Sequence, residues 1–363
     1  MSIESILKNE GISIVRELDK QEVKTIAKDI SIKLCLSFPE HSLSRKKIYD
    51  ALSSIKMYLA TLPNDYSGAK YILDNNSIYF NNKIPFEDIP STAMHECIHF
   101  IQHYNTNDDF GLSNSVALNE AAVQLMASEA NMNGISNVKY FDISLNTISP
   151  DYYPLECALL NQVAYFTGTF PLYCSVLYSN DIFQNTFTTK FNKKMYTDIS
   201  AKLDEILVME NELNYYIEEL SYATSKSKID SLNKTINYRK QKITILFFKT
   251  QNYIMKNCFK CEFNHIKTLE DLHDFKNKLY QYKNIIGYND NYTFYNDFYC
   301  SMMNALSAKK EYLIAHGSKE LTSESTELIV IDSKRNIFTK AKDLFKKLKE
   351  IFKSDVNKDY INE

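Results

Sequence analysis

The 363-residue sequence contains no tryptophan and only seven glycines and seven prolines. Gly and Pro are the residues that most often end helices and form tight turns. Their scarcity therefore predicts long helices and argues against a sandwich of many short strands. Hydrophobic residues make up 44% of the chain, which is enough to bury a core, and the length allows two domains or one domain with large insertions.

The sequence also has no apolar run of the length expected in an exported or membrane-spanning protein. The N-terminal stretch MSIESILKNEGISIVRELDKQE carries charges throughout, and no later window approaches 18 apolar residues. The net charge of -3 predicts no strong attraction to nucleic acid. Seven cysteines are scattered without the spacing of a disulfide framework, so we expect reduced thiols and a cytoplasmic protein.

Local patterns predict a first set of elements. Residues 1–60 have apolar positions three and four apart, for example in KKIYDALSSIKMYLATL, and are predicted to be helical. KYILD and SIYF, joined by two asparagines, predict a β-hairpin, and SIYF (residues 77–80) is interpreted as an edge strand to which an extended peptide would add. Pro90 is expected to begin a helix that runs to about Tyr104, followed by a polar loop and a helix over about 115–132.

The helix expected after Pro90 contains the sequence HECIH. His95 and His99 are four residues apart, so they lie on one helix face, about 6 Å apart along the axis, and can direct two imidazoles at one metal ion. Glu96 is rotated by about 100° and lies beside that face, where a carboxylate can take a proton from water on the metal. This is the HExxH arrangement, which supplies two zinc ligands and a general base and needs a third ligand from elsewhere.

Three residues are candidates for the third ligand. His103 continues the four-residue spacing, but it lies two turns beyond His95, about 12 Å along the axis, which one ion cannot easily span. The next predicted helix, VALNEAAVQLMASEA, offers Glu120 and Glu129. Zinc bound by three protein ligands keeps a fourth position for water, whose pKa falls to about 7.

HECIH, a loop, and then NEAAVQ resemble the gluzincin metallopeptidases, in local pattern their thermolysin-like branch, over about residues 70–130. The resemblance implies a zincin-like domain in which His95, His99 and Glu120 hold one zinc ion per chain. It also implies that Glu96 is the general base for peptide hydrolysis.

Two features depart from that family. Its aspartate four residues after the third ligand is Gln124 here, although a neutral amide can still accept an imidazole N–H. The family's oxyanion-stabilising histidine has no evident counterpart, so His265, His273, His316 and several tyrosines stay as candidates.

The cysteines give weaker signals. Cys258, Cys261 and His265 resemble half of a zinc knuckle that Cys300 would have to complete, and we interpret them as structural or incidental. Cys97 lies inside the motif but is expected to point away from the two histidines and to act as a small buried hydrophobe.

Residues 198–249 predict an antiparallel helical hairpin or coiled-coil arm. Apolar residues recur at steps of four and three in both halves, interrupted by one polar residue each, Glu210 and Arg239. The first arm, 198–222, has seven acids and one lysine, whereas the second, 226–249, has seven bases and one aspartate. Because these charges complement each other, we favour arms that pair with each other over an arm that binds a partner.

The C-terminal region combines the polar link SKELTSEST, a strand-like run ELIVID and a basic amphipathic helix over about residues 336–353. Lysines cover one face of that helix and apolar residues the other. It could contact an anionic membrane surface or another protein, or it could pack on its own domain with its lysines in water.

The sequence therefore predicts a mainly helical α+β protein with three parts. These are a zincin-like metallopeptidase domain over 1–190, a helical region over 191–318, and a linker, strand and basic helix over 319–363. The expected function is zinc-dependent hydrolysis of peptide or protein substrates, as an endopeptidase in preference to an exopeptidase. The alternative is a non-catalytic binding or scaffold protein on the same fold, acting through its hairpin and basic helix.

Overall fold

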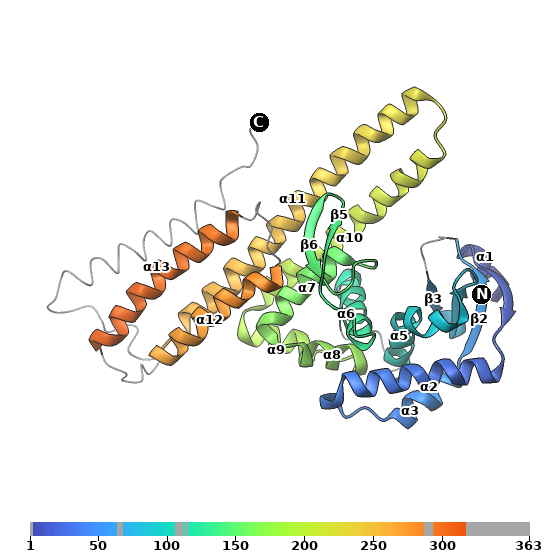
Figure 1. The fold of residues 1–363 in the computed structure, drawn as a ribbon, viewed down its shortest axis with the longest axis horizontal. Coiled ribbons are helices and arrows are strands. Elements are labelled where there is room, and N and C mark those ends of the chain that lie inside the picture. The colour runs from blue at the N-terminus through green and yellow to red at the C-terminus, as the bar shows by residue number, and fades with distance from the viewer. Residues whose placement is uncertain (1–2, 64–67, 106–111, 113–114, 287–292, 317–363) are drawn as a thin grey trace. The chain divides into compact units, whose positions relative to one another are not determined.

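The computed structural model describes residues 3–63, 68–105, 112, 115–286 and 293–316. These residues fall into two compact units, the first ending at Ile254 and the second beginning at Met255. Helices predominate and the sheets are small, as the α+β prediction requires (Figure 1). None of the described helices is both long and apolar enough to cross a membrane.

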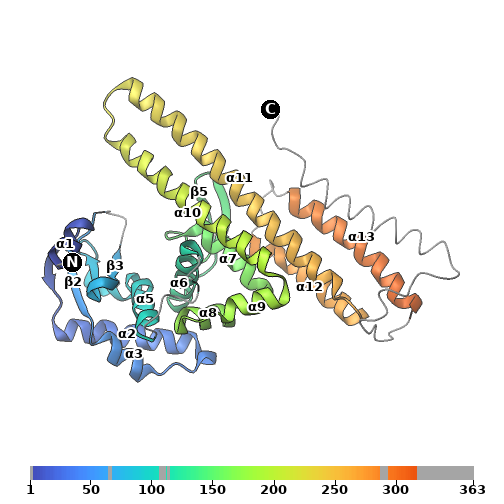
Figure 2. The same cartoon turned by 180° about the vertical axis from the view of Figure 1, so that it is seen from behind.

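The first unit contains all the described strands and most of the helices. The strands are β1 (Ser13–Glu17), β2 (Lys56–Thr61), β3 (Ala69–Ile72), β4 (Ser77–Asn81), β5 (Ser136–Tyr140) and β6 (Ile143–Thr147). The helices are α1 (Ile3–Asn9), α2 (Lys20–Ser37), α3 (Arg45–Leu52), α4 (Ile89–Thr92), α5 (Met94–Asn105), α6 (Val116–Ala130), α7 (Pro154–Thr167), α8 (Thr169–Tyr178), α9 (Ile182–Lys190), α10 (Lys193–Ser221) and the first part of α11 (Lys226–Asn264). Figures 1 and 2 show α2 and α3 packed side by side.

Four strands form a mixed sheet in the order β1-β2-β4-β3. β3 and β4 pair antiparallel, as the predicted hairpin requires, whereas β2 and β4 pair in parallel. The prediction that residues 77–80 form an edge strand is wrong. β4 lies between β2 and β3, and each of its residues is buried, so β3 is the edge on this side of the sheet.

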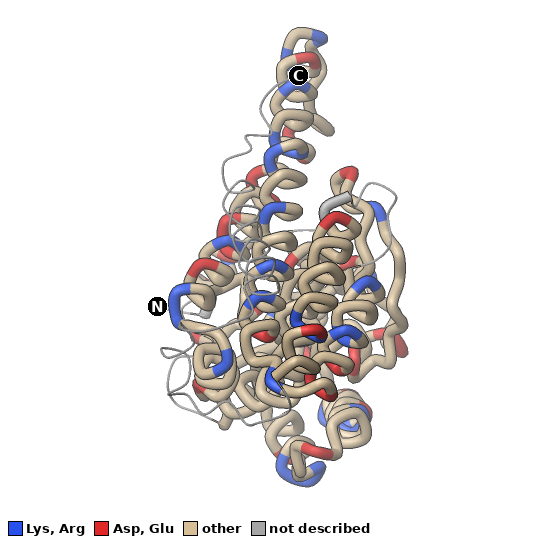
Figure 3. Tube along the Cα trace, turned by 90° about the vertical axis from the view of Figure 1, so that its left-hand side faces the viewer, with Lys and Arg blue, Asp and Glu red and all other residues tan. Residues whose placement is uncertain are grey.

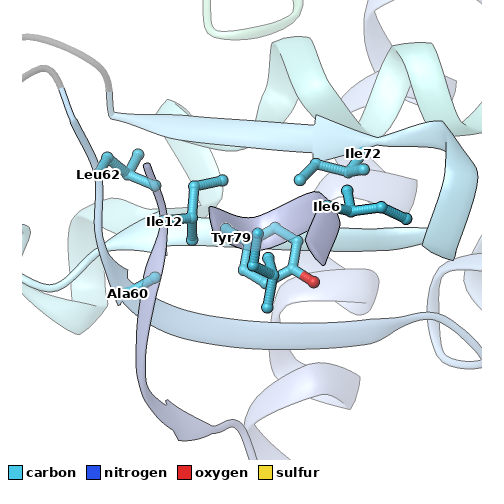
Figure 4. Close-up of a cluster of buried hydrophobic side chains, with 7 residues drawn as sticks. Ile6, Ile12, Ala60, Leu62, Ile72 and Tyr79 are labelled. Carbon is cyan, nitrogen blue, oxygen red and sulfur yellow. The ribbon is translucent and has the colours of Figure 1, made fainter. Parts of the chain in front are cut away.

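One face of the sheet packs against the N-terminal segment. Ile6 and Ile12 join Ala60, Ile72 and Tyr79 in a cluster of buried apolar side chains (Figure 4). The prediction of helices throughout residues 1–60 is therefore only partly right. Residues 13–17 and 56–61 are strands, because β2 pairs with β1 on one side and with β4 on the other, segments whose pairing the local sequence pattern does not reveal.

The predicted antiparallel hairpin is present as α10 and the first part of α11. Arg239 pairs with Glu212 toward the turn, and the Tyr253 hydroxyl donates to Asp198 Oδ2 over 2.8 Å toward the base. These partners lie progressively farther from the turn on both arms, as antiparallel helices require. Figure 3 marks the charged positions along the two arms.

The base of this hairpin belongs to the core of the first unit, and only its tip is an appendage. α10 packs on α6, α7 and α9, and its buried residues include Ile199, Leu203, Ile206 and Leu213. Beyond Leu213 the side chains emerge, with Tyr215 59% and Tyr222 73% exposed. The first compact unit extends to Ile254, so it includes the hairpin that the sequence places after residue 190.

Glu210, which interrupts the apolar pattern of α10, is buried against Glu156 of α7. The two residues are 4% and 0% exposed, and the two carboxyls interact with each other. Neither carboxyl forms an ion pair with a described residue. Burial raises the pKa of both carboxyls, and the mutual repulsion of two negative charges adds to that of Glu210.

The second unit contains the end of α11 with α12 (Leu269–Ile286) and α13 (Thr293–His316). Its core is aromatic: Phe259 contacts Phe275 and Tyr282 edge-on, with ring centroids 5.5 and 5.2 Å apart. The predicted strand ELIVID and the predicted basic helix over 336–353 lie outside the described residues.

Candidate metal centre

The first two candidate ligands lie on α5, which is oriented by its apolar face. Met94, Cys97 and Ile98 are completely buried, and α5 packs against α3, α6, α8 and β3. Burial of that face leaves His95 and His99, one turn apart, directed at α6. Their side chains are 13% and 11% exposed, so they are enclosed and still reachable.

The third candidate ligand lies on α6, which is rich in alanine and almost wholly buried, so its backbone can approach α5 closely. Its N-terminus is held by two side chains. Ser115 Oγ accepts the N–H of Leu118 over 3.1 Å, and Asp204 of α10 accepts the N–H of Ala117 over 2.9 Å. The negative charge of Asp204 also suits the positive end of the helix. These contacts set the rotation of α6 that places Glu120.

His95, His99 and Glu120 come together, with their ligand atoms all within 4.8 Å of one another. His95 Nε2 lies 3.0 Å from His99 Nε2 and 3.1 Å from Glu120 Oε2, and His99 Nε2 lies 3.5 Å from Glu120 Oε1. Two ligand atoms bound tetrahedrally to zinc at about 2.0–2.1 Å lie about 3.3–3.4 Å apart. The three residues therefore fit one zinc ion in both donor type and spacing.

Two buried amides orient the imidazoles. Gln124 Oε1 lies 2.8 Å from His95 Nδ1, and Gln102 Oε1 lies 3.0 Å from His99 Nδ1. An amide oxygen can only accept, so each Nδ1 is the donor and each Nε2 is left to bind a metal. Gln124 is where the sequence analysis expects it. Gln102 was missed, although its position three residues after His99 on the same helix is a usable signal.

Opposing forces act on the charges of this cluster. Burial disfavours the Glu120 carboxylate, but hydrogen bonds and positive charge from His95 and His99 outweigh burial and hold the Glu120 pKa well below its ordinary value. Burial lowers the pKa of His99, but the hydrogen bond and charge of Glu120 outweigh it and raise that pKa. The cluster thus keeps Glu120 ionised, which is the form in which a carboxylate binds a metal.

Glu96 follows His95 on α5 and points to the sheet. Its Oε2 accepts the backbone N–H of Tyr71 in β3 over 2.8 Å. Because β3 is the edge strand, this hydrogen bond fixes the carboxylate between the edge of the sheet and the three candidate ligands. Glu96 also lines the pocket described below, so its carboxylate can meet a bound molecule.

Tyr153 and Tyr152 line the pocket beside the centre. The sequence alone does not distinguish these two tyrosines from the others as candidates to stabilise an oxyanion. The Tyr153 ring stacks on His95 with centroids 5.9 Å apart, and its hydroxyl is hydrogen-bonded to Glu120. Burial and the Glu120 charge raise the Tyr153 pKa well above its usual range, so its hydroxyl stays protonated as a donor. Tyr153 has a left-handed backbone (φ 49°) just before Pro154 begins α7, which a Tyr-Tyr-Pro sequence alone does not reveal.

A pocket of about 380 Å³ opens beside these residues. It is bounded by the edge strand at Gly68 and Ala69, by His95 and Glu96, and by the segment that includes Tyr153. Small and polar side chains line much of it, namely Ser91, Thr92, Ala127, Ser128, Asn131, Asn133 and Ser149.

The structure does not bring the rival ligands to the cluster. Among the described residues, the metal-ligating group that forms around the HECIH helix contains neither His103 nor Glu129. His103 lies in the last turn of α5, and Glu129 Oε2 accepts the Tyr173 hydroxyl of α8 over 2.5 Å.

The other candidates lie elsewhere. His265, His273 and His316 belong to the second unit. All seven cysteines are free thiols, and no metal-ligating group includes Cys258, Cys261 or Cys300 within the described ranges. Cys97 is wholly buried, as expected of a small hydrophobe, and burial raises its pKa well above the usual range.

Comparisons with known protein families, with curated proteins and with solved structures found no match to this chain.

Proposed function

We propose that the protein is a zinc-dependent metallopeptidase that hydrolyses peptide bonds in the pocket beside Glu96. His95, His99 and Glu120 would hold one zinc ion per chain. When bound in such a site, zinc acts as a Lewis acid toward a carbonyl group and lowers the pKa of a water molecule to about 7.

The chain's own residues account for the proton transfers. Glu96 takes the proton of the attacking water and delivers it to the leaving nitrogen, which turns a poor leaving group into a neutral amine. The hydrogen bond from Tyr71 N–H to Glu96 holds the carboxylate in place while leaving its other oxygen for this work. The protonated hydroxyl of Tyr153, which lines the same pocket, would donate to a developing oxyanion.

One observation carries the proposal. Three ligand atoms of the type and spacing that zinc requires converge on one point, and the residue after the first ligand, Glu96, lines a pocket beside them. Electrostatics support the same function, because the cluster holds the pKa of the Glu120 carboxyl below its ordinary value and so keeps it in the ionised form that binds a metal. The large share of small side chains in the pocket leaves room for a peptide.

Glu96→Gln tests the mechanism directly. Gln keeps the size of the side chain and can still accept the Tyr71 N–H, but it cannot take a proton at neutral pH. We expect zinc to stay bound, as measured by mass spectrometry, and turnover of a mixed peptide library to fall at least about 10²–10⁴-fold.

The matched control is Glu87→Gln, an exposed glutamate outside the pocket, which should leave turnover unchanged. Full activity of Glu96→Gln would remove Glu96 from the mechanism. Stoichiometric zinc in a wild-type protein that cleaves no peptide would favour the alternative of a non-catalytic binding protein.

A further inference from the structure

The loop between α6 and β5 contributes residues to the pocket lining and also exposes apolar side chains to solvent. Asn131 and Asn133 line the pocket, while the side chain between them, Met132, points outward and is 88% exposed. Ile135 of the same loop is 62% exposed. Among the described large apolar side chains, Met132 is the most exposed.

This loop is held firmly. Asn131 Nδ2 donates to the carbonyl of Ser91 over 2.8 Å, and Asn133 Nδ2 donates to the carbonyl of Ile148 over 3.4 Å. Backbone hydrogen bonds from Met132 and Asn133 back into the last turn of α6 close the loop, at 2.9 Å each. The outward position of Met132 is thus set by contacts on both sides, at segments that themselves bound the pocket.

Met132 has a left-handed backbone with φ 59°. This conformation is unfavourable for an unbranched side chain such as methionine and suits Gly or Asn better. Burial cannot explain methionine at this position, because its side chain is almost fully in water. The left-handed conformation closes the C-terminus of α6, and it places this apolar side chain between two residues that line the pocket, where it can contact a molecule bound there.

We propose that Met132 and Ile135 form a recognition rim that binds an apolar side chain of the peptide substrate. This proposal rests on the proposed peptidase function and specifies its substrate class. The pocket interior, with its serines, threonine and asparagines, takes a small or polar residue next to the scissile bond. The rim takes an apolar residue a short distance along the same peptide, and Tyr152, which lines the pocket and is 42% exposed, adds apolar surface at the mouth.

Met132→Asn separates recognition from folding. Asn adopts the left-handed backbone more readily, so the melting temperature should stay the same or rise, while the apolar contact disappears. For peptides with Leu, Met or Phe at the rim position, KM should rise about 5- to 20-fold with kcat unchanged. Peptides with Ser at that position should be cleaved as by the wild type, and Met132→Leu should restore the preference.

Val116→Asn is the matched control, because Val116 is 67% exposed on α6 and lies outside the pocket lining. Equal KM values for apolar and Ser peptides in wild type would contradict the proposed rim. Equal effects of Met132→Asn and Val116→Asn on the KM of apolar peptides would also contradict it.

A separate binding measurement distinguishes failure of the proposed rim from failure of the proposed peptidase function. Affinities of the same labelled peptides for the zinc-loaded Glu96→Gln protein are measured by fluorescence polarisation, with and without Met132→Asn. A loss of affinity confined to apolar peptides supports the rim even if wild type hydrolyses nothing. Absence of any binding preference for apolar peptides overturns the rim even if wild type is an active peptidase.

Discussion

Two glutamates of the first unit, the partly buried Glu120 and the fully buried Glu156, have pKa values shifted in opposite directions. Glu120 lies between His95 and His99, and its pKa is held far below the ordinary value. Glu156 lies against another carboxyl, Glu210, and its pKa is raised. Burial disfavours the ionised form at both positions, so the difference comes from the partners.

The comparison separates a site that attracts a cation from one that retains a proton. At Glu120, positive charge on the two imidazoles balances the negative charge of the carboxylate. A metal ion that replaces an imidazole proton is also positive, so the carboxylate keeps a partner of opposite charge. At Glu156 and Glu210 no basic group of the described residues forms an ion pair with either carboxyl, so a shared proton is the simplest way to avoid two adjacent buried negative charges. Acidic residues in the core are therefore not equivalent evidence for metal binding.

The largest expected effect comes from Glu120→Gln. Removing a ligand should lower zinc affinity by more than about 100-fold, because loss of residues that merely support a ligand costs about 10–100-fold. Zinc content and competition with a chelator measure the effect, and Glu156→Gln is the matched control that should keep its zinc. Retention of zinc by Glu120→Gln, with loss in Glu129→Gln or His103→Ala, would reassign the third ligand.

A middle-sized effect is expected from Glu210→Gln. An unfolded glutamate has a pKa of about 4.3, whereas both folded carboxyls have raised values. Above pH 4.3 the folded protein therefore holds protons that the unfolded chain has lost, so the free energy of unfolding decreases as pH rises through the folded pKa. Gln removes one titrating group and can donate to Glu156.

We accordingly expect the melting temperature of Glu210→Gln to fall less between pH 5 and pH 8.5 than that of wild type. At pH 8.5 the variant should be more stable by about 1–3 kcal/mol. Glu205→Gln, an exposed glutamate on the same helix, should follow the wild-type curve. Identical slopes for Glu210→Gln and wild type would contradict the shared proton.

The smallest effect is expected from Gln124→Glu, which places a carboxylate where the amide now accepts the His95 N–H. A carboxylate partner raises the basicity of the imidazole, so zinc affinity should increase by up to about 10-fold. Ser128 and Ser149, which now accept from the amide nitrogen, can turn their hydroxyls to donate instead. A decrease in affinity would mean that the polar cluster around Gln124 requires an amide donor.

The sequence predicts the parts of the centre that depend on local spacing. His95, Glu96 and His99 share one helix, and Glu120 and Gln124 share the next. Helical periodicity therefore determines the relative positions of the residues within each helix. The sheet and its edge were predicted less well. Whether residues 56–61 form a strand, and whether β4 is central, depends on pairing with segments distant in the chain.

Tertiary contacts explain the remaining misses. The polar interruption at Glu210 is visible in the sequence. Its partner Glu156 lies on another helix, α7, and no sequence pattern indicates that the two residues meet. Asp204 likewise looks like one acid among seven on a charged arm, although it holds the N-terminus of the helix that carries Glu120. The arm was therefore predicted as an appendage, whereas its base supports the candidate centre.

Burial of Cys97, the cysteine inside HECIH, protects the candidate centre from thiol oxidation. Oxidation to sulfenic acid requires a thiolate that peroxide can reach, and Cys97 offers neither access nor ionisation. Cys300 is exposed and is the thiol that oxidants or alkylating labels reach first. Oxidation of thiols therefore begins at Cys300 in the second unit, while the helix carrying His95 and His99 keeps its thiol reduced.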